Sequence, residues 1–316
     1  DSQNRPVMDP ELKQAIFKID SYETFRTIAL RVFSFQAEHN PVYREYLDTL
    51  GADPAKVRDP ETIPFLPIEF FRTRRVLCDN RDPEIVFESS GTTRSTPSRH
   101  FLADASIYQR SFTEGFRRFY GPPDNYCILA LLPSYLESSG SSLVYMMDHL
   151  IGLSGHPDSG FYLDQLEDLA GILCKRRQDR HPTILLGVSF ALLDLAEKFP
   201  MELADPIIVM ETGGMKGRRK ELVREELHRI LTAAFGLPVI HSEYGMTELL
   251  SQAYSQGGGL FKTPPWMKIL IRDPNDPLTI WHRSKGAVSG GLNIIDLANL
   301  YSCSFIATGD LGRSEE

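Results

Sequence analysis

The sequence predicts an α/β fold with a mostly parallel sheet flanked by helices. Two observations support this prediction. From residue 84 onward, short apolar runs bounded by Gly, Pro, Asp or Asn alternate with longer segments that carry one apolar face. Such runs are typical of strands buried on both faces, and their regular alternation with helices is typical of a parallel sheet.

Length and composition limit the class of protein. The chain has 316 residues, enough for one large domain or two, and its 42% hydrophobic and 24% charged residues are globular values. A net charge of −8 argues against a general binder of nucleic acid or membrane surfaces. No apolar run reaches the ~20 residues of a membrane span, and the polar first residues carry no signal-peptide core. The cysteines are widely spaced, without the spacing of a zinc site, as expected for reduced thiols in the cytoplasm.

Residues 1–75 are predicted to form a helical segment packed on the main domain. Helices are expected at 12–19, 22–38 and 42–50, because apolar residues recur at a spacing of three to four, most clearly in the second. Asn40 and Pro41 end the second helix, and residues 63–67 form an extended connector.

Residues 76–256 are predicted to form the α/β core. Strands are expected at 85–87, 126–132, 183–188, 206–210 and 238–241. Helices are expected at 104–119, 142–151, 163–176, 190–198 and 220–235, the last with one apolar and one charged face.

Residues 257–316 are predicted to form a small β-rich module. Three glycines at 257–259 and a Pro pair at 264–265 interrupt the preceding pattern. Short β-like runs follow at 267–272, 278–282, 291–295 and 303–307. We expect an antiparallel module attached to the main sheet.

The most informative stretch is FESSGTTRSTPSRH, which spans residues 87–100 and follows an apolar run. It sets hydroxyls and a Gly beside the cations Arg94 and Arg99. Gly lets the backbone approach a ligand closely, and hydroxyl and N–H groups donate to anionic oxygens. The stretch predicts a loop that wraps a polyphosphate, although a Ser/Thr-rich surface turn fits it equally well. Its spacing differs from that of the ordinary P-loop.

Two further motifs each follow a predicted strand, at the sheet edge where α/β proteins bind ligands. ETGGMKG at 211–217 offers bare Gly backbone on which a flat ring can lie. HSEYGMTE at 241–248 offers an aromatic face at Tyr244, a hydroxyl at Thr247 and a carboxylate at Glu248, the kind of oxygen ligand that Mg²⁺ favours. Each also fits an ordinary turn or a surface carboxylate.

A fourth motif, Thr308-Gly309-Asp310, follows a β-like run. The Asp310 carboxylate can accept both hydroxyls of a ribose. An Asp-Leu-Gly turn is the plainer alternative.

The order of these four motifs resembles the adenylate-forming superfamily of acyl-CoA synthetases, firefly-type luciferases and peptide-synthetase adenylation domains. A closer resemblance is to the acyl-protein synthetase family, the ligase component of the bioluminescence fatty-acid reductase complex, which is related to phenylacetate–CoA ligases. The matching segments of the closer resemblance are 35–36, 40–43, 63–71, 132–136, 141–146 and 211–216. The resemblance runs from about Tyr22 to Gly312, and it implies the fold of the large amino-terminal domain of these enzymes.

The resemblance implies an ATP site with Mg²⁺. The residues that would cradle the β- and γ-phosphates are Ser89, Ser90, Gly91, Thr92 and Thr93. Those that would surround the adenine are Gly213, Gly214, Tyr244 and Gly245. Thr247 would contact the α-phosphate or the carboxylate, Glu248 would bind Mg²⁺, and Asp310 would hold the ribose.

The resemblance also implies an acid-binding segment between a strand end and a helix. Tyr135, Ser139 and Met146 lie there, where relatives bind the carboxylate-bearing tail, although an ordinary loop and helix N-cap fits the segment as well. His241 is a further candidate for this pocket. His100 and His149 are interpreted as structural.

Two departures from the superfamily stand out. Arg94 occupies a position that is usually Gly, and Arg99 is the nearest cation to the position of a usual Lys. The sequence ends at Glu316, shortly after Asp310, so we expect the carboxy-terminal lid to be absent. Cys303 lies in an apolar β-like run and is interpreted as a core residue, so we expect the acyl-accepting Cys beyond Glu316 or on a partner.

These inferences predict ATP-dependent activation of a fatty or aryl acid as an acyl-adenylate, followed by transfer to a thiol. The nucleotide and the acid would bind to the core at 76–256. The acceptor would be a protein cysteine, a carrier or CoA, with an acyl reductase as a partner protein. Two alternatives stay open: an AMP-forming acyl- or aryl-CoA ligase, and a catalytically degenerate nucleotide-binding or scaffold subunit.

Overall fold

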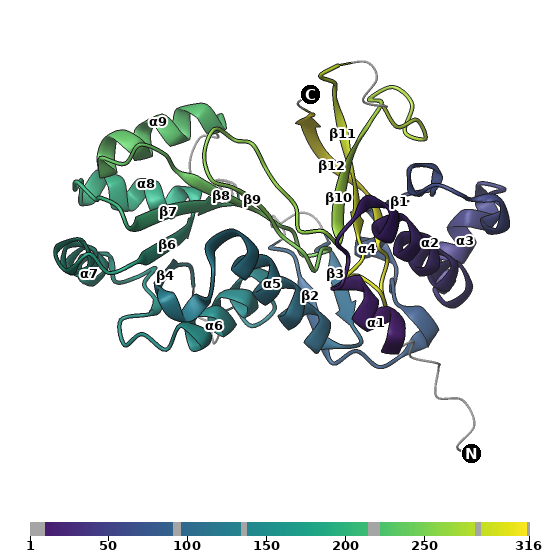
Figure 1. Ribbon diagram of the computed structural model, residues 1–316, viewed down its shortest axis with the longest axis horizontal. Helices are drawn as coiled ribbons and strands as arrows, with labels where there is room; N and C mark the ends of the chain where they lie inside the picture. The colour runs from purple at the N-terminus through teal and green to yellow at the C-terminus, as the bar shows by residue number, and fades with distance from the viewer. Residues whose placement is uncertain (1–9, 91–95, 134–137, 214–221, 282–285, 315–316) are drawn as a thin grey trace. The chain divides into compact units, whose positions relative to one another are not determined.

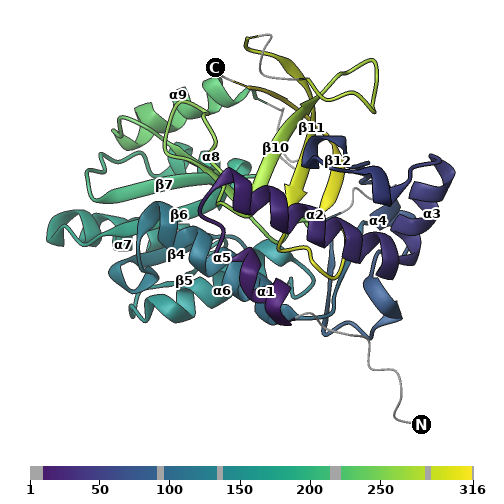
Figure 2. The same cartoon turned by 45° about the vertical axis from the view of Figure 1, so that its right-hand side comes forward.

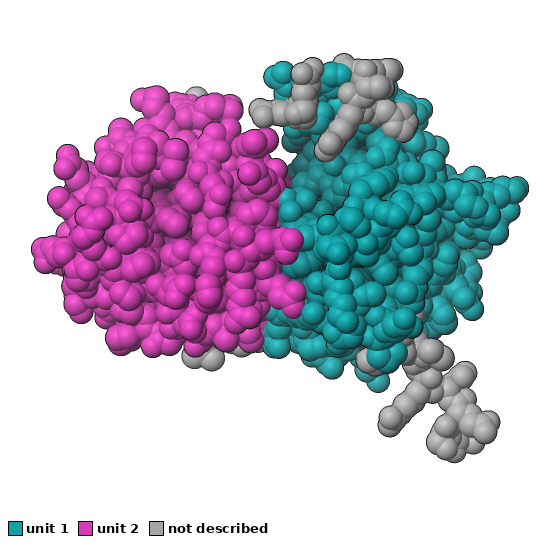
Figure 3. Space-filling model, viewed as in Figure 1, with its two compact units in different colours: residues 1–111, 247–251, 263–316 teal, residues 112–246, 252–262 magenta. Residues whose placement is uncertain are grey.

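The chain divides into two compact units (Figure 3). In the computed structural model, unit 1 comprises residues 1–111, 247–251 and 263–316, and unit 2 comprises residues 112–246 and 252–262. The structure describes residues 10–90, 96–133, 138–213, 222–281 and 286–314. The domain division that the sequence predicts, at residues 75 and 256, stays a prediction.

A six-stranded sheet forms the centre of unit 2 (Figure 1). Its strand order is β5-β4-β6-β7-β8-β9, and every pair is parallel except β8 with β9. The strands are β4 (Cys127–Leu131), β5 (Gly160–Phe161), β6 (Thr183–Val188), β7 (Ile207–Thr212), β8 (His241–Tyr244) and β9 (Ala253–Ser255). β4 and β6 are buried along their whole length, as a sheet covered on both faces requires. The predicted mostly parallel α/β sheet is confirmed.

The order of the first five strands is that of a doubly wound sheet. The connection from β4 to β5 moves one way across the sheet, and the later connections move the other way. Right-handed crossovers therefore place α6 (Ser142–Ser154) on one face and α7 (Leu166–Asp179), α8 (Ser189–Lys198) and α9 (Arg224–Phe235) on the other. The direction in which the connections cross the sheet reverses between β4 and β6. Ligands of such sheets bind beyond the carboxyl ends of the strands at that point.

The sequence misplaced two of these strands. Residues 238–240 precede β8, which begins at His241, so the motif HSEY is itself the strand rather than the loop after it. The apolar run at 85–87 forms β2 (Ile85–Glu88), which pairs with β3 (Arg99–Leu102) as a separate antiparallel hairpin of unit 1. Apolar content alone predicts a strand but not its partner.

The long helix of unit 1 is α2 (Tyr22–His39), which lies in the foreground of Figure 2. The other helices of this region are α1 (Pro10–Ile16), α3 (Pro41–Thr49) and α4 (Phe70–Thr73), with one-turn helices at Pro54–Lys56, Pro60–Thr62 and Cys78–Asn80. Asn40 joins α2 to α3: its N–H donates to the Gln36 carbonyl, and its side chain accepts from the N–H groups of Val42 and Tyr43. The helix break predicted at Asn40 and Pro41 is confirmed.

The second sheet of unit 1 has the order β1-β12-β11-β10. β10 (Met267–Arg272), β11 (Ser289–Asp296) and β12 (Phe305–Arg313) are antiparallel, and β1 (Leu66–Pro67) adds a parallel edge from the predicted connector. The antiparallel β module predicted near the carboxyl end is confirmed, but it forms this sheet with β1 instead of extending the parallel sheet. Of the run at 278–282, Ile280 makes only an isolated bridge to Arg272, and His282 lies outside the described residues.

α5 (Ala105–Tyr120) contains the boundary between the units at residues 111 and 112, and a one-turn helix at Pro123–Asn125 follows it. None of the helices that the structure describes is long and apolar enough to cross a membrane.

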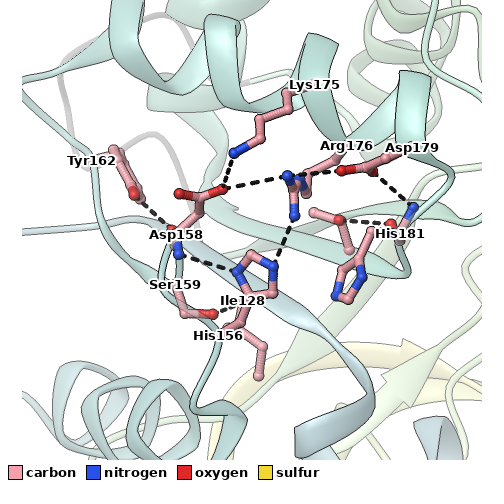
Figure 4. Close-up of polar contacts among 10 residues, drawn as sticks. Ile128, His156, Asp158, Ser159, Tyr162, Lys175, Arg176, Asp179 and His181 are labelled. Atoms are coloured by element: carbon pink, nitrogen blue, oxygen red, sulfur yellow. Dashed lines mark hydrogen bonds and ion pairs between the residues drawn. The ribbon is translucent and has the colours of Figure 1, made fainter.

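Arg176 fixes α7 to the loop before β5 (Figure 4). Its guanidinium donates to His156 Nε2 at 2.8 Å and pairs with Asp179 at 2.8 Å and Asp158 at 3.6 Å. Because the guanidinium can only donate, His156 accepts and is neutral there. Burial and the nearby charges of His181 and Arg176 lower the pKa of His156 accordingly.

Candidate functional site

The base of the predicted phosphate loop is a closed hairpin. The N–H of Ser89 donates to the Ser98 carbonyl at 3.0 Å, and the N–H of Ser98 donates to Ser89 Oγ at 2.9 Å. Ser90 follows on the loop. The remaining loop residues of the prediction, Gly91, Thr92, Thr93 and Arg94, lie outside the described residues. Arg99 begins β3 on its exposed side, with its guanidinium 5.5 Å from the Phe101 ring centroid.

Two buried side chains hold the backbone of the Thr247-Glu248 turn. His100 Nδ1 donates to the Thr247 carbonyl at 2.8 Å, and Asn299 Nδ2 donates to the Glu248 carbonyl at 2.8 Å. His100 and Asn299 are both fully buried. Burial lowers the pKa of His100 to about 4, so the ring is neutral at neutral pH. The interpretation of His100 as a structural residue agrees with this environment.

Asp296 fixes the residues that follow the turn. Its carboxylate accepts hydrogen bonds from the N–H groups of Leu250 and Ser251 at 2.8 and 2.9 Å, and from Ser251 Oγ at 2.5 Å. Burial raises the pKa of Asp296, and the hydrogen bonds that the carboxylate accepts limit the rise to about 6. The carboxylate is therefore ionised at pH 7 and holds this part of the chain.

Glu248 lies where several predicted site segments meet. Its side chain is hydrogen-bonded to the hydroxyl of Ser98, at the loop base. Burial raises the pKa of Glu248, the Ser98 hydrogen bond and the positive charge of Arg72 lower it, and the negative charge of Asp310 raises it further. The residue is 5% exposed. Thus the loop base, the Thr247-Glu248 turn and Asp310, which are far apart in sequence, come together in unit 1.

Asp310 lies within β12, not after the strand as its sequence pattern predicted. The β11–β12 register shifts between Gly291 and Asn293, and there Thr308 Oγ1 donates to the Leu292 carbonyl at 2.9 Å. Thr308 Oγ1 also accepts from the N–H of Asp310 at 3.2 Å. The Thr308 hydroxyl is therefore hydrogen-bonded both to the backbone at the register shift and to the backbone of Asp310.

Close packing against Arg272 explains the two glycines opposite this segment. A Cβ on Gly290 would lie 2.1 Å from the Arg272 carbonyl oxygen, and one on Gly291 would lie 2.5 Å from the Arg272 guanidinium. That guanidinium donates to Asn293 Oδ1 at 2.6 Å and to the Thr308 carbonyl at 2.9 Å.

In unit 2, the predicted adenine residues lie at the carboxyl ends of neighbouring strands. β7 pairs with β8 in register up to Thr212 opposite Glu243, so Gly213 and Tyr244 are the next residues of the two strands. Gly213 has φ +67°, a conformation that favours Gly, and its carbonyl accepts from Ser189 Oγ at 2.6 Å. Gly214 lies outside the described residues.

Glu243 is a buried carboxyl group beside these residues. Burial raises its pKa to about 7, with a smaller contribution from the negative charge of Glu211 and against a hydrogen bond from the Thr212 hydroxyl, which lowers it. A Cβ on Gly245 would lie 2.6 Å from Glu243 Oε1, so Gly245 gives this carboxyl group its space.

The predicted acid-binding residues have unlike environments. Ser139 lies on an exposed turn after β4, beside the point where the strand order changes direction, whereas Met146 in α6 is 1% exposed. His241 begins β8, at the opposite end of the strand from Tyr244, and contacts the Tyr120 hydroxyl through Nδ1 at 3.1 Å. Burial lowers the pKa of His241. Tyr135 lies outside the described residues.

The sequence did not identify one polar cluster of unit 2. Glu211 Oε1 lies 3.3 Å from Arg224 Nε and 3.5 Å from His228 Nε2, and Ser242 Oγ lies 3.3 Å from the same His228 atom. A pocket of about 290 Å³ adjoins it, between α9 and the segments 238–240 and 258–259. These residues have no shared motif, so spacing in sequence could not group them.

The donor set at Glu248 fits Mg²⁺. In the parts of the chain that the structure describes, no group of three or more His, Cys, Asp or Glu side chains could hold a metal. Mg²⁺ does not need such a group, because it keeps several waters and binds one or two carboxylates together with substrate phosphates. Glu248, with Asp310 near enough to raise its pKa, supplies that kind of site.

Cys303 is a core residue, as the sequence predicted. It is fully buried, and its thiol donates to the Phe305 carbonyl at 3.4 Å. Burial raises the pKa of Cys303 to about 12, which leaves almost no thiolate at neutral pH.

Comparisons with protein-family models and with curated proteins find no match. Among solved structures, the chain is similar to that of McyG A-PCP complexed with phenylalanyl-adenylate, with 19% identity, a TM-score of 0.52 and coverage of 85% of this chain and 49% of that one. It also matches an adenylation domain of a keto acid-selecting NRPS module bound to keto acyl adenylate, with 14% identity, a TM-score of 0.49 and coverage of 87% and 56%. A third match is unliganded o-succinylbenzoate coenzyme A synthetase from Bacillus subtilis, with 16% identity, a TM-score of 0.48 and coverage of 73% and 49%.

The chain spans about half the length of these solved structures. At such low identity the likeness concerns the fold alone, and the argument rests on the McyG structure, whose TM-score exceeds 0.5. The chain has the fold of the part of the McyG structure that it matches.

Proposed function

We propose that this protein activates a fatty or aryl carboxylic acid with ATP, as an acyl-adenylate, and that the acyl group then passes to a thiol. The observation that carries the proposal is the meeting at Glu248 of the loop base and Asp310 in unit 1. A phosphate loop, a metal-binding carboxylate and a ribose-binding carboxylate are the parts that an ATP site requires. The fold supports the same class of reaction.

In the first step, an oxygen of the substrate carboxylate attacks the α-phosphorus of ATP. The new carboxylate–phosphorus bond forms as the bond from the α-phosphorus to the bridging oxygen breaks, and pyrophosphate leaves. The carboxylate is already ionised, so positioning and charge neutralisation matter more than a general base. In the second step, a thiolate attacks the acyl carbonyl, AMP leaves, and the thiol proton passes to solvent.

The residues of this chain bind and orient the reactants. Ser89, Ser90 and the following loop bind the β- and γ-phosphates through hydroxyl and N–H groups. Glu248 holds Mg²⁺, which neutralises phosphate charge when bound. Asp310 accepts the ribose hydroxyls, and Tyr244 stacks on the adenine.

The loop cations and the acid pocket complete the proposed site. Arg94 and Arg99 supply positive charge at the loop. Thr247 contacts the α-phosphate or the carboxylate. Ser139, Tyr135, Met146 and His241 line the proposed path of the acid.

The thiol acceptor is proposed to lie on another molecule or on a segment outside residues 1–316. Cys303 is unsuited to the role, because an acceptor must be reachable and must ionise. We propose a protein cysteine or carrier thiol as the acceptor, with an acyl reductase as the partner that consumes the product.

ATP–pyrophosphate exchange with a panel of fatty, aryl and amino acids tests the activity. Acid-dependent exchange is expected. Acyl label that stays on protein and is released by hydroxylamine supports transfer to protein, whereas a CoA thioester supports a CoA ligase. Measurable ATP binding without exchange for any acid would support a degenerate nucleotide-binding subunit instead.

Glu248→Gln tests the metal role. Loss of the negative charge is expected to lower the rate of Mg·ATP-dependent exchange by about tenfold or more, the scale for one charge-stabilising group. The matched control is Glu225→Gln, which changes an exposed Glu of α9. Exchange at an unchanged rate in the Glu248 variant would exclude the metal role.

A further inference from the structure

The Thr247-Glu248 turn is held through its backbone, not through its functional side chains. His100 and Asn299 donate to two consecutive carbonyls, each at 2.8 Å. The two donors come from different parts of the chain, β3 and the segment between β11 and β12. They therefore fix both peptide groups at the point where Glu248 leaves the backbone.

These two contacts determine the hydrogen-bonding capacity left on each side chain. A carbonyl only accepts, so His100 must carry its proton on Nδ1, and Nε2 presents a lone pair. Asn299 uses Nδ2 as a donor, so its Oδ1 presents lone pairs. Both remaining atoms, His100 Nε2 and Asn299 Oδ1, are buried and have no hydrogen-bond partner among the protein atoms that the structure describes.

The same two residues line one small pocket of unit 1. Its volume is about 10 Å³, and Ser302 lines it as well. Ser302 Oγ is the third buried polar atom here that lacks a partner in the described protein. Asp104, the carboxylate among the lining residues, is paired with Lys13 at 2.5 Å, so the pocket has no unbalanced charge of its own.

Two lone-pair acceptors and one hydroxyl complement a single water molecule. Water can donate to His100 Nε2 and Asn299 Oδ1 and accept from Ser302 Oγ. Buried waters typically make about three such bonds, and a site of this size holds about one of them. An apolar ligand would leave all three atoms unsatisfied, and a cation would meet only the Asp104 carboxylate, which is already paired with Lys13.

We propose that His100 and Asn299 are positioning residues for the Thr247-Glu248 turn, and that one water bound in this pocket joins them to Ser302. The network sets the direction of the Glu248 carboxylate before the nucleotide binds. This inference rests on the proposed function only for the consequence in catalysis. The water and the tautomer belong to the resting protein.

The segment that carries Asn299 and Ser302 is itself rigidly held. Gln36 Nε2 donates to the carbonyls of Asn299 and Leu300, both at 2.9 Å, and Asn40 Nδ2 donates to the Ser302 carbonyl at 2.8 Å. The pocket wall is thus anchored to α2, which makes an ordered water the expected occupant.

Crystallography and NMR spectroscopy test the hydrogen-bond network of the ligand-free protein without an activity assay. A crystal structure at a resolution that shows ordered water should contain one water within hydrogen-bond distance of at least two of the three atoms. Long-range ¹H–¹⁵N NMR spectra of His100 should show the Nδ1–H tautomer between pH 6 and 8. The Nε2–H tautomer, or a pocket with no ordered water, would overturn the proposal.

Kinetics test the consequence for the site. Asn299→Ala should raise the Mg²⁺ concentration for half-maximal pyrophosphate exchange about tenfold, the scale for residues that orient metal ligands. Ser302→Ala, which contacts neither carbonyl, should raise it about threefold, as for one lost hydrogen bond. The matched control is Ser304→Ala, a buried Ser of the same segment that bonds to Gln36 and does not line the pocket.

Thermal unfolding of each variant separates folding from positioning. If Asn299→Ala does not fold, the Mg²⁺ dependence of Ser302→Ala and the position of the water in the crystal structure still test the positioning role. Equal Mg²⁺ dependence in Ser302→Ala, Ser304→Ala and the unchanged protein would overturn the positioning role. Absence of exchange in the unchanged protein would refute the proposed function, and the NMR and crystallographic results would still decide this inference.

Discussion

At the scale of single residues, buried carboxyl groups differ in the number of hydrogen bonds that they accept and in the charges nearby. Asp296 accepts several hydrogen bonds from backbone and hydroxyl donors, whereas Glu243 accepts one from Thr212 and lies near Glu211. The first is a structural anion, and the second takes up a proton near neutral pH. The two residues therefore predict different responses to substitution.

Asp296→Asn is expected to lower the free energy of unfolding by about 2–4 kcal/mol. An amide cannot accept at both of its side-chain atoms, so donors at Leu250 or Ser251 lose their partner while buried. Urea denaturation of the variant measures the loss. Asp276→Asn, on an exposed turn, serves as the control, and an equal loss in both would contradict the anchoring role.

Glu243 predicts that stability falls as the pH rises from about 4.5 to about 7. Its pKa is raised in the folded state to about 7, so the folded protein binds this proton more tightly than the unfolded chain does. The stabilisation is fully present at pH values below the pKa of the unfolded chain, and it is lost as the pH rises through the pKa of the folded state. The free energy of unfolding falls by about 3 kcal/mol over this range. Urea denaturation at pH 5 and pH 8 measures it.

Glu243→Gln removes this titration while keeping an acceptor for the Thr212 hydroxyl. The free energy of unfolding of this variant should therefore fall less between pH 5 and pH 8 than that of the unchanged protein. Glu225→Gln, at an exposed position, should retain the full pH dependence. An identical pH dependence in all three proteins would refute a raised pKa at Glu243.

At the scale of elements, one residue serves two helices and the loop that supports the site. Asn40 ends α2, begins α3 and donates to the Ser302 carbonyl. The side chain therefore couples helix capping to the position of the segment that holds Glu248. The N-cap Asp53, by comparison, accepts from the N–H of Ala55, two residues away.

Asn40→Ala should destabilise the protein by about 2–3 kcal/mol. It removes an N-cap, worth about 1 kcal/mol, and leaves the buried Ser302 carbonyl without this donor. Asp53→Ala, which removes the cap of an exposed one-turn helix, should cost less than about 1 kcal/mol. Thermal unfolding of both variants compares them, and similar losses would contradict the double role.

At the scale of the whole molecule, the carboxyl ends of the parallel strands of unit 2 lie along one edge of the sheet. The direction in which successive connections cross the sheet reverses between β4 and β6. This strand order places the carboxyl ends of β4, β6, β7 and β8 in succession along this edge, where such sheets bind ligands. Binding of any ligand there would stabilise the folded chain by mass action.

Mg²⁺ with a non-hydrolysable ATP analogue should raise the unfolding temperature. At 100 times the dissociation constant the gain is about 2.7 kcal/mol, which corresponds to a few degrees for a chain of this size. Differential scanning fluorimetry measures the shift, and Glu248→Gln should reduce it. A temperature unchanged by Mg²⁺ and the analogue at high concentration would contradict nucleotide binding.

The sequence by itself determined the local elements and the order of the motifs. Apolar runs and periodicity predicted β4, β6, β7, β10 and the long helices to within a few residues, because burial on both faces or on one face leaves a pattern along the chain. Asn40 with Pro41 marked a helix junction through backbone geometry alone. The core position of Cys303 followed from its apolar neighbours.

The tertiary structure alone decided which segments pair and what surrounds each site residue. β2 and β3 form a hairpin apart from the parallel sheet, and Asp310 lies inside a strand. The partners of Glu248, which are Ser98, Arg72 and Asp310, come from separate segments, and so do the anchors His100 and Asn299. Long-range hydrogen bonds and burial depend on the packing of distant segments, which leaves no periodic signal in the sequence.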